Sequence, residues 1–387
     1  MPLARCLRRP LPGRILLGRA LLGRILLGLM AAAVLATGAA AAPITLTDIA
    51  GRTVTLPAPA RRIVLAEGRQ LFALALIDPD PVARLAGWSA DLKRRDVTNY
   101  ARVKARFPAV EDIPIVGEES DASFSVEKAL SVQPDLVVLS GRLGAGRPEQ
   151  MVQQFTAAGV PVVFVDFYAH PLENTLPSLL ILGQALGRTE QAQAYAAFYT
   201  AHMQRISERL KAPGLVRPKV LMEAHAGGFG ECCNVPARGS IGDFIPFAGG
   251  HNIAADMVTA THGHLSLEYV LAADPAIYIA TGGPHLAGTG GLVLGPEVPE
   301  AEAQASLRRV VARPGVAELQ AVRTGQVHGL YHNLVNMPVN VLVAEALAKW
   351  LHPELFADLD PQATLAEMNA RFLAIPLAGS YWIDLAP

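Results

Sequence analysis

Two adjacent cysteines and one arginine stand in the stretch GECCNVPARGS, residues Gly230–Ser240. Because Cys232 and Cys233 are neighbours, they cannot join distant segments, and their spacing is not the C-x2-C pattern of a zinc site. In an oxidising compartment the two cysteines can form a disulfide. The alternative is an unreactive pair near a turn. The chemistry of this stretch therefore depends on where the chain is located and on which strand the loop leaves.

Cationic, aromatic and imidazole side chains follow several expected strands, at the point where each strand ends. Open parallel sheets bind ligands at the carboxyl ends of their strands, so we expect these side chains to line a cleft. Arginine gives anionic oxygens bidentate hydrogen bonds, and aromatic rings give flat apolar contact. The expected ligand-binding residues are Arg69, Trp88, Arg142, Tyr168, His225, Cys232, Cys233, Arg238, His285, Tyr331 and His332.

These residues also have plainer interpretations. The three arginines can be solvated charges or salt-bridge partners, Trp88 can belong to the core, and His225 and His285 can be ordinary loop histidines. The sequence shows no compact group of His, Asp and Glu with metal-ligand spacing. We therefore assign no metal ligand, no resident cofactor and no catalytic residue.

Short apolar strands alternate with helical segments on both sides of a long helical stretch. RIVLA (62–66), PDLVVLS (134–140) and VPVVFVDF (160–167) are expected strands of the first half, and KVLMEAH (219–225) opens a second series. Residues 174–210 between them have a helical pattern. Continuous apolar strands that alternate with helices indicate parallel sheets covered on both faces. The sequence thus predicts an α/β protein with two lobes joined by a long helical spine.

The chain divides into four expected segments. They are a signal peptide (1–41), an N-terminal α/β lobe (42–172), a linking long helix (173–212) and a C-terminal α/β lobe with C-terminal helices (213–387). The first segment has six arginines, no acidic residue and an apolar run that ends in small residues, as secretory signal peptides do. A transmembrane anchor is the alternative, but the run is short for a bilayer span and rich in Ala and Gly.

The charge of the mature chain limits its partners. Without the leader, 346 of the 387 residues remain, and they carry 27 basic and 34 acidic side chains, a net charge of −7. An acidic surface argues against nucleic acid as a partner. No later stretch is apolar and long enough to span a membrane, so we expect an exported protein in the periplasm.

The two halves repeat one element. SVEKALSVQPDLVVLS begins at Ser125 and SLEYVLAADPAIYIAT begins at Ser266, at the same stage of each lobe. Both copies place a glutamate, Glu127 or Glu268, at the start of a helix, where the helix dipole favours a negative charge. The repeat indicates that the lobes are structural duplicates.

Four stretches together resemble the periplasmic binding proteins for ferric siderophores, haem and cobalamin, which serve ATP-driven (ABC) importers. They are DIAGRTVTLPAPARRIVLAEG, SVEKALSVQPDLVVLS, FIPFAGGHNIAAD and SLEYVLAADPAIYIATGGP, and their order covers nearly the whole mature chain. The resemblance implies two Rossmann-like lobes joined by one long helix, with the ligand in the cleft between them. It also implies that Glu127 and Glu268 dock onto the importer's permease dimer.

This resemblance makes the expected cargo a ferric-siderophore-type chelate, carried by a monomer that catalyses nothing. Cobalamin and haem remain alternative ligands, because the arginine content only leans towards an anionic chelate. From a different class, a periplasmic enzyme that acts on a metal complex through Cys232 or Cys233 also remains open. Fold alone does not decide between a binding protein and an enzyme, so the site must.

Overall fold

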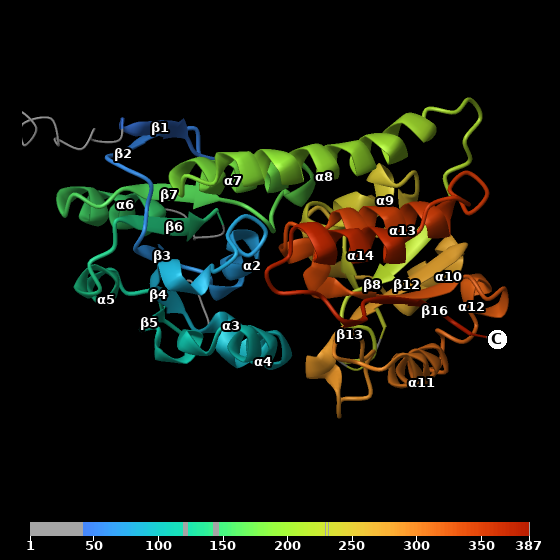
Figure 1. Ribbon diagram of the computed structural model, residues 1–387. Coiled ribbons are helices and arrows are strands. Elements are labelled where there is room, and N and C mark those ends of the chain that lie inside the picture. Colours follow the sequence, from blue (N-terminus) through green and yellow to red (C-terminus); the bar gives the residue numbers. More distant parts are fainter. Residues whose placement is uncertain (1–41, 119–122, 142–146, 229, 231, 387) are drawn as a thin grey trace, which may run out of the picture. The chain divides into compact units, whose positions relative to one another are not determined.

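The N-terminal sheet has five parallel strands in the order β5-β4-β3-β6-β7 (Figure 1). The computed structural model describes residues 42–386, apart from 119–122, 142–146, 229 and 231, so the expected signal peptide lies outside the described residues. The strands are β3 Ile63–Leu65, β4 Leu85–Ser89, β5 Ile115–Gly117, β6 Leu136–Ser140 and β7 Val162–Val165. An antiparallel hairpin, β1 Ile44–Thr47 and β2 Thr53–Leu56, precedes them.

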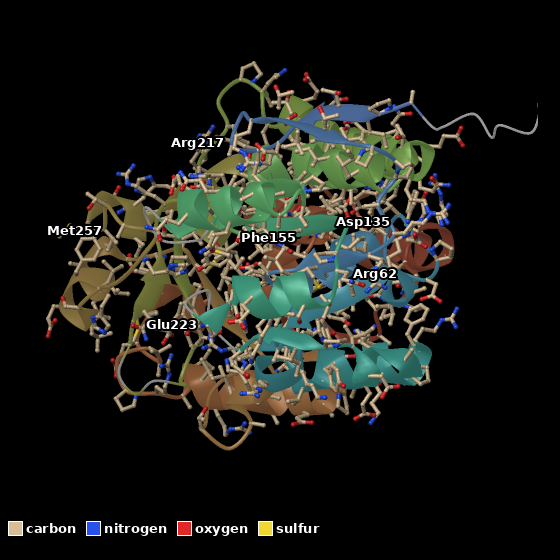
Figure 2. The ribbon with its side chains drawn as sticks, turned by 90° about the vertical axis from the view of Figure 1, so that its left-hand side faces the viewer. Arg62, Asp135, Phe155, Arg217, Glu223 and Met257 are labelled. Carbon is tan, nitrogen blue, oxygen red and sulfur yellow. A yellow bond between two sulfur atoms is a disulfide. The ribbon has the colours of Figure 1, made fainter. Side chains whose placement is uncertain are left out.

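Both faces of this sheet are buried, as the continuous apolar runs predict. Leu65 and Val138 belong to one core cluster, whereas Val64 and Val137 belong to another, because successive side chains point to opposite faces. Phe155, labelled in Figure 2, is fully buried in the second cluster. The helices of this lobe are α2 Leu71–Leu74, α3 Asp91–Arg95, α4 Val97–Arg106, α5 Val126–Ser131 and α6 Arg147–Ala157.

The sequence pattern suggests one surface helix after β4, but the structure has two, α3 and α4. Asp96 between them leaves the helical region of backbone space, and its carboxylate accepts a hydrogen bond from the Asn99 N–H at 3.4 Å. This is an N-cap, which begins a new helix. Asp91, the first residue of α3, and Asp96 both line the cavity described below.

The connection between the lobes is made of two consecutive helices, α7 Pro171–Ala185 and α8 Thr189–Arg209, and not of the single long helix expected over 173–212 (Figure 1). The chain between them contains Gly187 with φ +65°, a conformation that glycine adopts without steric cost. α8 is 21 residues long and packs against α7 and against α13 Val341–Leu351 of the C-terminal lobe. No helix within the described residues has the length and apolar character needed to cross a membrane.

The C-terminal sheet has the order β10-β8-β12-β14-β16. Its strands are β8 Lys219–Glu223, β10 His251–Asn252, β12 Ile277–Gly282, β14 Val327–Tyr331 and β16 Trp382–Asp384, and β16 pairs antiparallel with β14. The sequence pattern does not predict this three-residue edge strand. The larger helices are α10 Leu267–Ala273, α11 Glu300–Val311, α13 and α14 Pro361–Arg371, with short helices α9 Phe244–Phe247 and α12 Gln320–Arg323. Two short antiparallel pairs are β9 Asn234–Pro236 with β11 His262–His264, and β13 Gly295–Pro296 with β15 Gly379–Ser380.

The repeated element has the same local chemistry in both lobes. Ser125 caps α5 by accepting the Lys128 N–H, and Ser266 caps α10 by accepting the Tyr269 N–H, each at 3.2 Å. Each capped helix leads into a strand of its sheet, α5 into β6 and α10 into β12. Carboxylate contacts fix the entry to the first lobe: Asp135, labelled in Figure 2, accepts the backbone N–H groups of Arg61 and Arg62 at 2.8 Å.

Candidate functional site

A cavity of about 590 Å³, hereafter the strand-end cavity, lies where the parallel strands of the two sheets end. Its volume is in the range of small-molecule sites in proteins, about 300–1,000 Å³. Residues from the N-terminal lobe and from the C-terminal lobe line it together, as the rule for open parallel sheets predicts. The polar lining residues are Arg69, Asp91, Arg94, Arg95, Asp96, Tyr168, His225, Ser240, His262, Thr281, His285, His332, Asn333 and Asn336.

Three histidines converge on the C-terminal side of this cavity. His225 follows β8, His285 follows β12 and His332 follows β14, so three adjacent strands each deliver one imidazole. His225 Nδ1 lies 3.1 Å from His285 Nε2, and one nitrogen from each of the three rings lies within 4.8 Å of the others. We call this group the histidine triad.

All three imidazoles are neutral at neutral pH. Burial, with smaller effects of His285 and His262, lowers the pKa of His225 to about 4. Burial also lowers the pKa of His285, although the charge of Asp96 opposes it. Burial and the neighbouring rings lower the pKa of His332 well below its usual value. A neutral imidazole keeps a lone pair on one ring nitrogen. Such a lone pair can bind a metal ion or accept a hydrogen bond from a ligand.

The N-terminal side of the cavity is charged. The Arg69 guanidinium lies 3.5 Å from Asp91, whose carboxylate also accepts the Gly68 N–H at 2.6 Å. Burial disfavours the charge of Arg69, but the carboxylates of Glu67 and Asp91 outweigh it and raise the Arg69 pKa. Burial likewise raises the pKa of Asp91, against the opposing effect of Arg69. The result is a cation held in place by a carboxylate, with further N–H groups available to a ligand.

Two more arginines, Arg94 and Arg95 of α3, line the same side of the cavity. Arg94 pairs with Glu118 at 2.6 Å, and both side chains are about half exposed. These arginines and the carboxylates of Asp91 and Asp96 are not among the expected site residues. They follow β4 closely, which is where open sheets place ligand contacts, but the pattern from residue 91 onwards is that of one surface helix.

Tyr168 lies in the cavity as expected, and Asp166 holds its loop. The ring of Tyr168 stacks on His262, with centroids 6.4 Å apart and planes 15° apart. The Asp166 carboxylate accepts the backbone N–H groups of Tyr168, Ala169 and His170 at 2.7–3.0 Å, and the side-chain amide of Asn174 at 2.8 Å. Burial opposes the charged form, but these hydrogen bonds lower the pKa of Asp166.

Two aromatic residues selected from the sequence lie in the core rather than on the cavity wall. Trp88 is 1% exposed and packs near Tyr100, with ring centroids 6.2 Å apart. Tyr331 is fully buried, and its hydroxyl meets the side chains of Asn99 at 3.1 Å and Asp96 at 3.3 Å. Tyr331 thus joins the two lobes beneath the cavity, and it is not among the residues that line it.

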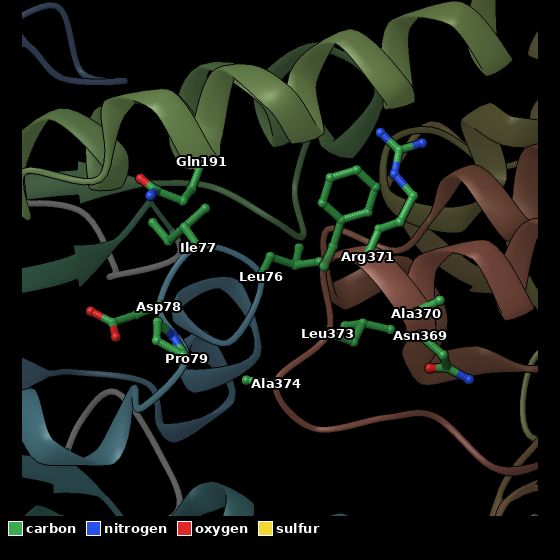
Figure 3. Close-up of a pocket in the computed structure, with 11 residues that line it drawn as sticks. Leu76, Ile77, Asp78, Pro79, Gln191, Asn369, Ala370, Arg371, Leu373 and Ala374 are labelled. Carbon is green, nitrogen blue, oxygen red and sulfur yellow. The ribbon is translucent and has the colours of Figure 1, made fainter.

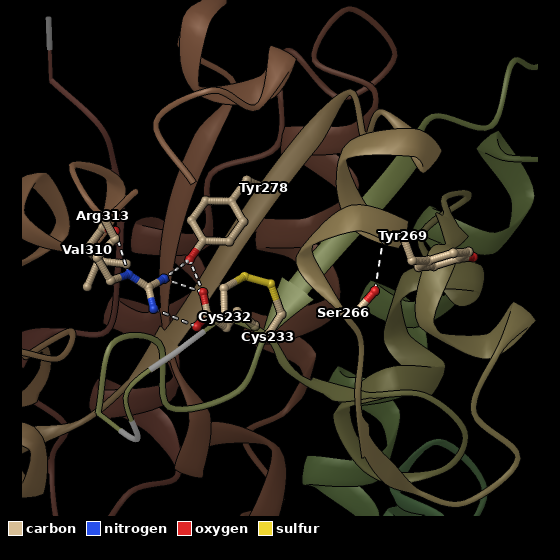
Figure 4. Close-up of a disulfide and its surroundings, with 8 residues drawn as sticks. Cys232, Cys233, Ser266, Tyr269, Tyr278, Val310 and Arg313 are labelled. Carbon is tan, nitrogen blue, oxygen red and sulfur yellow. Dashed lines mark hydrogen bonds and ion pairs between the residues drawn. A yellow bond between two sulfur atoms is a disulfide. The ribbon is translucent and has the colours of Figure 1, made fainter. Parts of the chain in front are cut away.

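The two adjacent cysteines do not lie in the strand-end cavity. Cys232 and Cys233 form a disulfide (Figure 4). Cys232 lines a separate cavity of about 580 Å³, together with His264, Glu268 and Arg313. The two sulfurs lie close to a carboxylate oxygen of Glu223, but bonded sulfurs are not thiolate ligands.

The described residues that line the strand-end cavity do not include the predicted Arg238. Arg238 is exposed and donates to the Ala255 carbonyl at 2.9 Å, and Arg142 lies outside the described residues.

A smaller cavity of about 250 Å³ lies between the loop after α2 and the end of α14 (Figure 3). Its carboxylate, Asp78, pairs with Arg84 at 2.5 Å and Arg188 at 3.1 Å, which is a structural arrangement.

Comparison with known proteins identifies the family. Residues 74–333 match the family described as periplasmic binding protein. The structure of the TroA-like periplasmic binding protein FepB from Veillonella parvula is similar, with a TM-score of 0.81 and 29% identity, covering 89% of this chain and 100% of that one. A cobalamin-binding protein from Halobacterium salinarum is 24% identical over 303 residues, 78% of this chain and 71% of the relative.

A nickel-bound structure of CeuE from Helicobacter pylori shares the fold, with a TM-score of 0.61 and 19% identity, covering 85% of this chain and 95% of that chain. The chain belongs to the periplasmic binding protein family, the solute-binding proteins that deliver ligands to ABC importers. The α/β architecture with two parallel-sheet lobes is confirmed, and so is the assignment to a binding protein rather than an enzyme.

Proposed function

We propose that this protein captures a ferric-siderophore-type chelate in the strand-end cavity and delivers it to an inner-membrane ABC importer. The observation that carries the proposal is the convergence of arginine cations and imidazoles in one cavity of about 590 Å³. Guanidinium groups suit the anionic oxygens of such a chelate, and the protein outside the cavity is acidic. Export to the periplasm through cleavage of the leader 1–41 belongs to the same proposal.

Cobalamin or haem is the second candidate for this cavity. The neutral imidazoles of the histidine triad favour it, because an imidazole can serve as an axial ligand to haem iron. The likeness to a cobalamin-binding protein from Halobacterium salinarum and to a haem-binding protein of the same fold supports this second candidate.

The proposed partner is a permease dimer that contacts Glu127 and Glu268. Both glutamates are exposed, and each lies in the first turn of the serine-capped helix of its lobe. A protein with two equivalent lobes can place two equivalent carboxylates on a two-fold symmetric partner. The disulfide cavity adjoins Glu268, so the Cys232–Cys233 loop lies beside this proposed docking site rather than in the strand-end cavity.

Native mass spectrometry and absorption spectra of the mature protein from an iron-starved periplasm test the ligand. A co-purifying mass with a ferric charge-transfer band supports the chelate, whereas a Soret or corrinoid band moves the assignment to haem or cobalamin. Substitution Arg69→Gln should then weaken binding of the identified ligand about ten- to hundredfold, the value of a charged hydrogen bond. The exposed Arg217→Gln is the matched control, and equal losses for both variants would contradict the proposal.

A further inference from the structure

The histidine triad has the spacing of a metal site. Metal–nitrogen distances near 2.0–2.1 Å place two imidazole nitrogens of one ion about 2.9–3.4 Å apart, for angles between octahedral and tetrahedral. The observed distance between His225 Nδ1 and His285 Nε2 is 3.1 Å, and the nitrogen of His332 lies within 4.8 Å of both.

The backbone around β12 builds this arrangement. His332 Nδ1 lies 2.6 Å from the Gly282 carbonyl and donates its proton there, which leaves the lone pair on Nε2. Histidines that ligate metals donate their other N–H in this way, often to a backbone carbonyl. A Cβ on Gly283 would lie 3.0 Å from His285 Nδ1 and 3.0 Å from His332 Cε1, so glycine is what lets these two rings approach.

The backbone at the third ligand is held in an uncommon conformation. His225 has φ +52°, which is unfavourable for a residue other than glycine and persists only where the surroundings enforce it. A hydrogen bond between His225 and His285 accounts for that pair alone. It does not account for a third imidazole with its lone pair in the same place.

We propose that His225, His285 and His332 bind the metal of the cargo directly, so that the cargo is a transition-metal chelate with open coordination positions. The proposal rests on the chelate capture of the proposed function, and it changes the expected cargo from a saturated ferric chelate to a chelate whose metal has open positions. Imidazole nitrogens suit nickel, copper, zinc, cobalt and iron(II) better than a ferric ion enclosed by six oxygens, which has no position to offer.

The rest of the cavity favours a chelate over a bare ion. Arg69, Arg94 and Arg95 line the same cavity, together with Asp91 and Asp96. Guanidinium groups give the carboxylates of a chelator hydrogen-bond partners that a bare metal ion would not use. A chelator that occupies three positions of the metal would face the arginines, while the histidine triad occupies the other three.

Isothermal titration of the metal-free mature protein tests this with three nickel probes. Nickel iminodiacetate leaves three positions open, nickel nitrilotriacetate leaves two, and nickel EDTA leaves none. We expect the affinity to fall in that order, with nickel iminodiacetate bound at least about tenfold more tightly than nickel EDTA. His285→Ala and His332→Gln should each weaken nickel iminodiacetate about 10- to 100-fold, as disturbance of a metal site does.

His251→Ala is the matched control, because its exposed imidazole pairs with Asp256 outside the cavity. Circular dichroism confirms that each variant is folded, and Gly283→Ala, which crowds two of the rings, gives an independent variant of the site. Equal affinity for the three nickel probes, or unchanged affinity in the histidine variants, would overturn direct metal binding.

A saturated ferric tris(catecholate) probe separates this outcome from failure of the proposed function. If wild type and the histidine variants bind that probe equally well and ignore the open nickel complexes, chelate capture stands and metal ligation by the triad is wrong. If the protein binds neither the nickel complexes nor the ferric probe, the proposed function falls with it.

Discussion

The two lobes share one architecture but present different chemistry at their strand ends. In the N-terminal lobe, the loops after β3 and β4 contribute Arg69, Asp91 and Asp96, which are charged. In the C-terminal lobe, β8, β12 and β14 each end in a neutral imidazole. Duplicate folds thus supply two halves of one site: one side suits the charge of a ligand and the other offers lone pairs.

The first strands of the two lobes differ in the opposite sense. β3 ends at Leu65 in an apolar core, whereas β8 ends at Glu223, which is 2% exposed. Arg313 compensates this carboxylate with two hydrogen bonds of 2.9 and 2.5 Å, and the Tyr278 hydroxyl also donates to it (Figure 4). The C-terminal lobe therefore contains a buried ion pair at a position where its counterpart relies on hydrophobic packing.

The largest effect is expected when this ion pair is broken. Arg313→Met leaves Glu223 buried without its cation and should lower the free energy of unfolding by about 3–5 kcal/mol. Urea denaturation followed by circular dichroism measures the change. Combining it with Glu223→Gln removes the orphaned charge and should recover part of the loss. A single variant as stable as the wild type would show that the two lobes do not differ in this respect.

A smaller effect is expected at Asp166, which shapes the N-terminal side of the cavity. Asp166→Ala leaves three backbone N–H groups without their carboxylate and should lower the free energy of unfolding by about 2–3 kcal/mol at neutral pH. Because the pKa of Asp166 is lower in the folded state, its contribution is complete above the unfolded pKa, near 3.9.

The pH dependence distinguishes this role from simple packing. The difference in unfolding free energy between wild type and Asp166→Ala should be constant from about pH 7 to pH 5 and should shrink as pH falls through the folded pKa of Asp166. Urea titrations at several pH values measure it. A difference that does not change down to pH 3 would assign the effect to lost contacts rather than to the carboxylate charge.

The sequence predicts the fold better than it predicts the site, for a physical reason. Strands buried on both faces, such as Leu136–Ser140, are apolar throughout and can be recognised locally, whereas the edge strand Trp382–Asp384 is short and leaves little pattern. Which strand ends face each other is set by sheet order, which local sequence does not encode. The three histidines of the triad could therefore be named individually, but not their convergence.

The same reasoning explains the residues that were misplaced. Trp88 and Tyr331 stand at strand ends, where the rule for open sheets places ligand contacts, yet each side chain turns into the core. Both strands are buried along their whole length, so a side chain near a strand end can pack into the core instead of reaching the cavity. Cys232 and Cys233 lie nine and ten residues beyond β8, far enough for their loop to reach a different cavity.

The smallest effect on stability, and the sharpest test of lobe equivalence, is expected at Glu127 and Glu268. Each is an exposed residue in the first turn of a helix, so Glu→Ala should cost only about 0.3–1 kcal/mol of stability and leave ligand affinity unchanged. Ligand uptake and ATP hydrolysis by the reconstituted importer should nevertheless fall by similar factors in the two single variants, and further in the double variant. Glu190→Ala, at the exposed first turn of α8, is the matched control. A symmetric partner that needs two anchors should respond equally to the loss of either glutamate. If only one of the two glutamates mattered, the lobes would be equivalent in fold but not in docking.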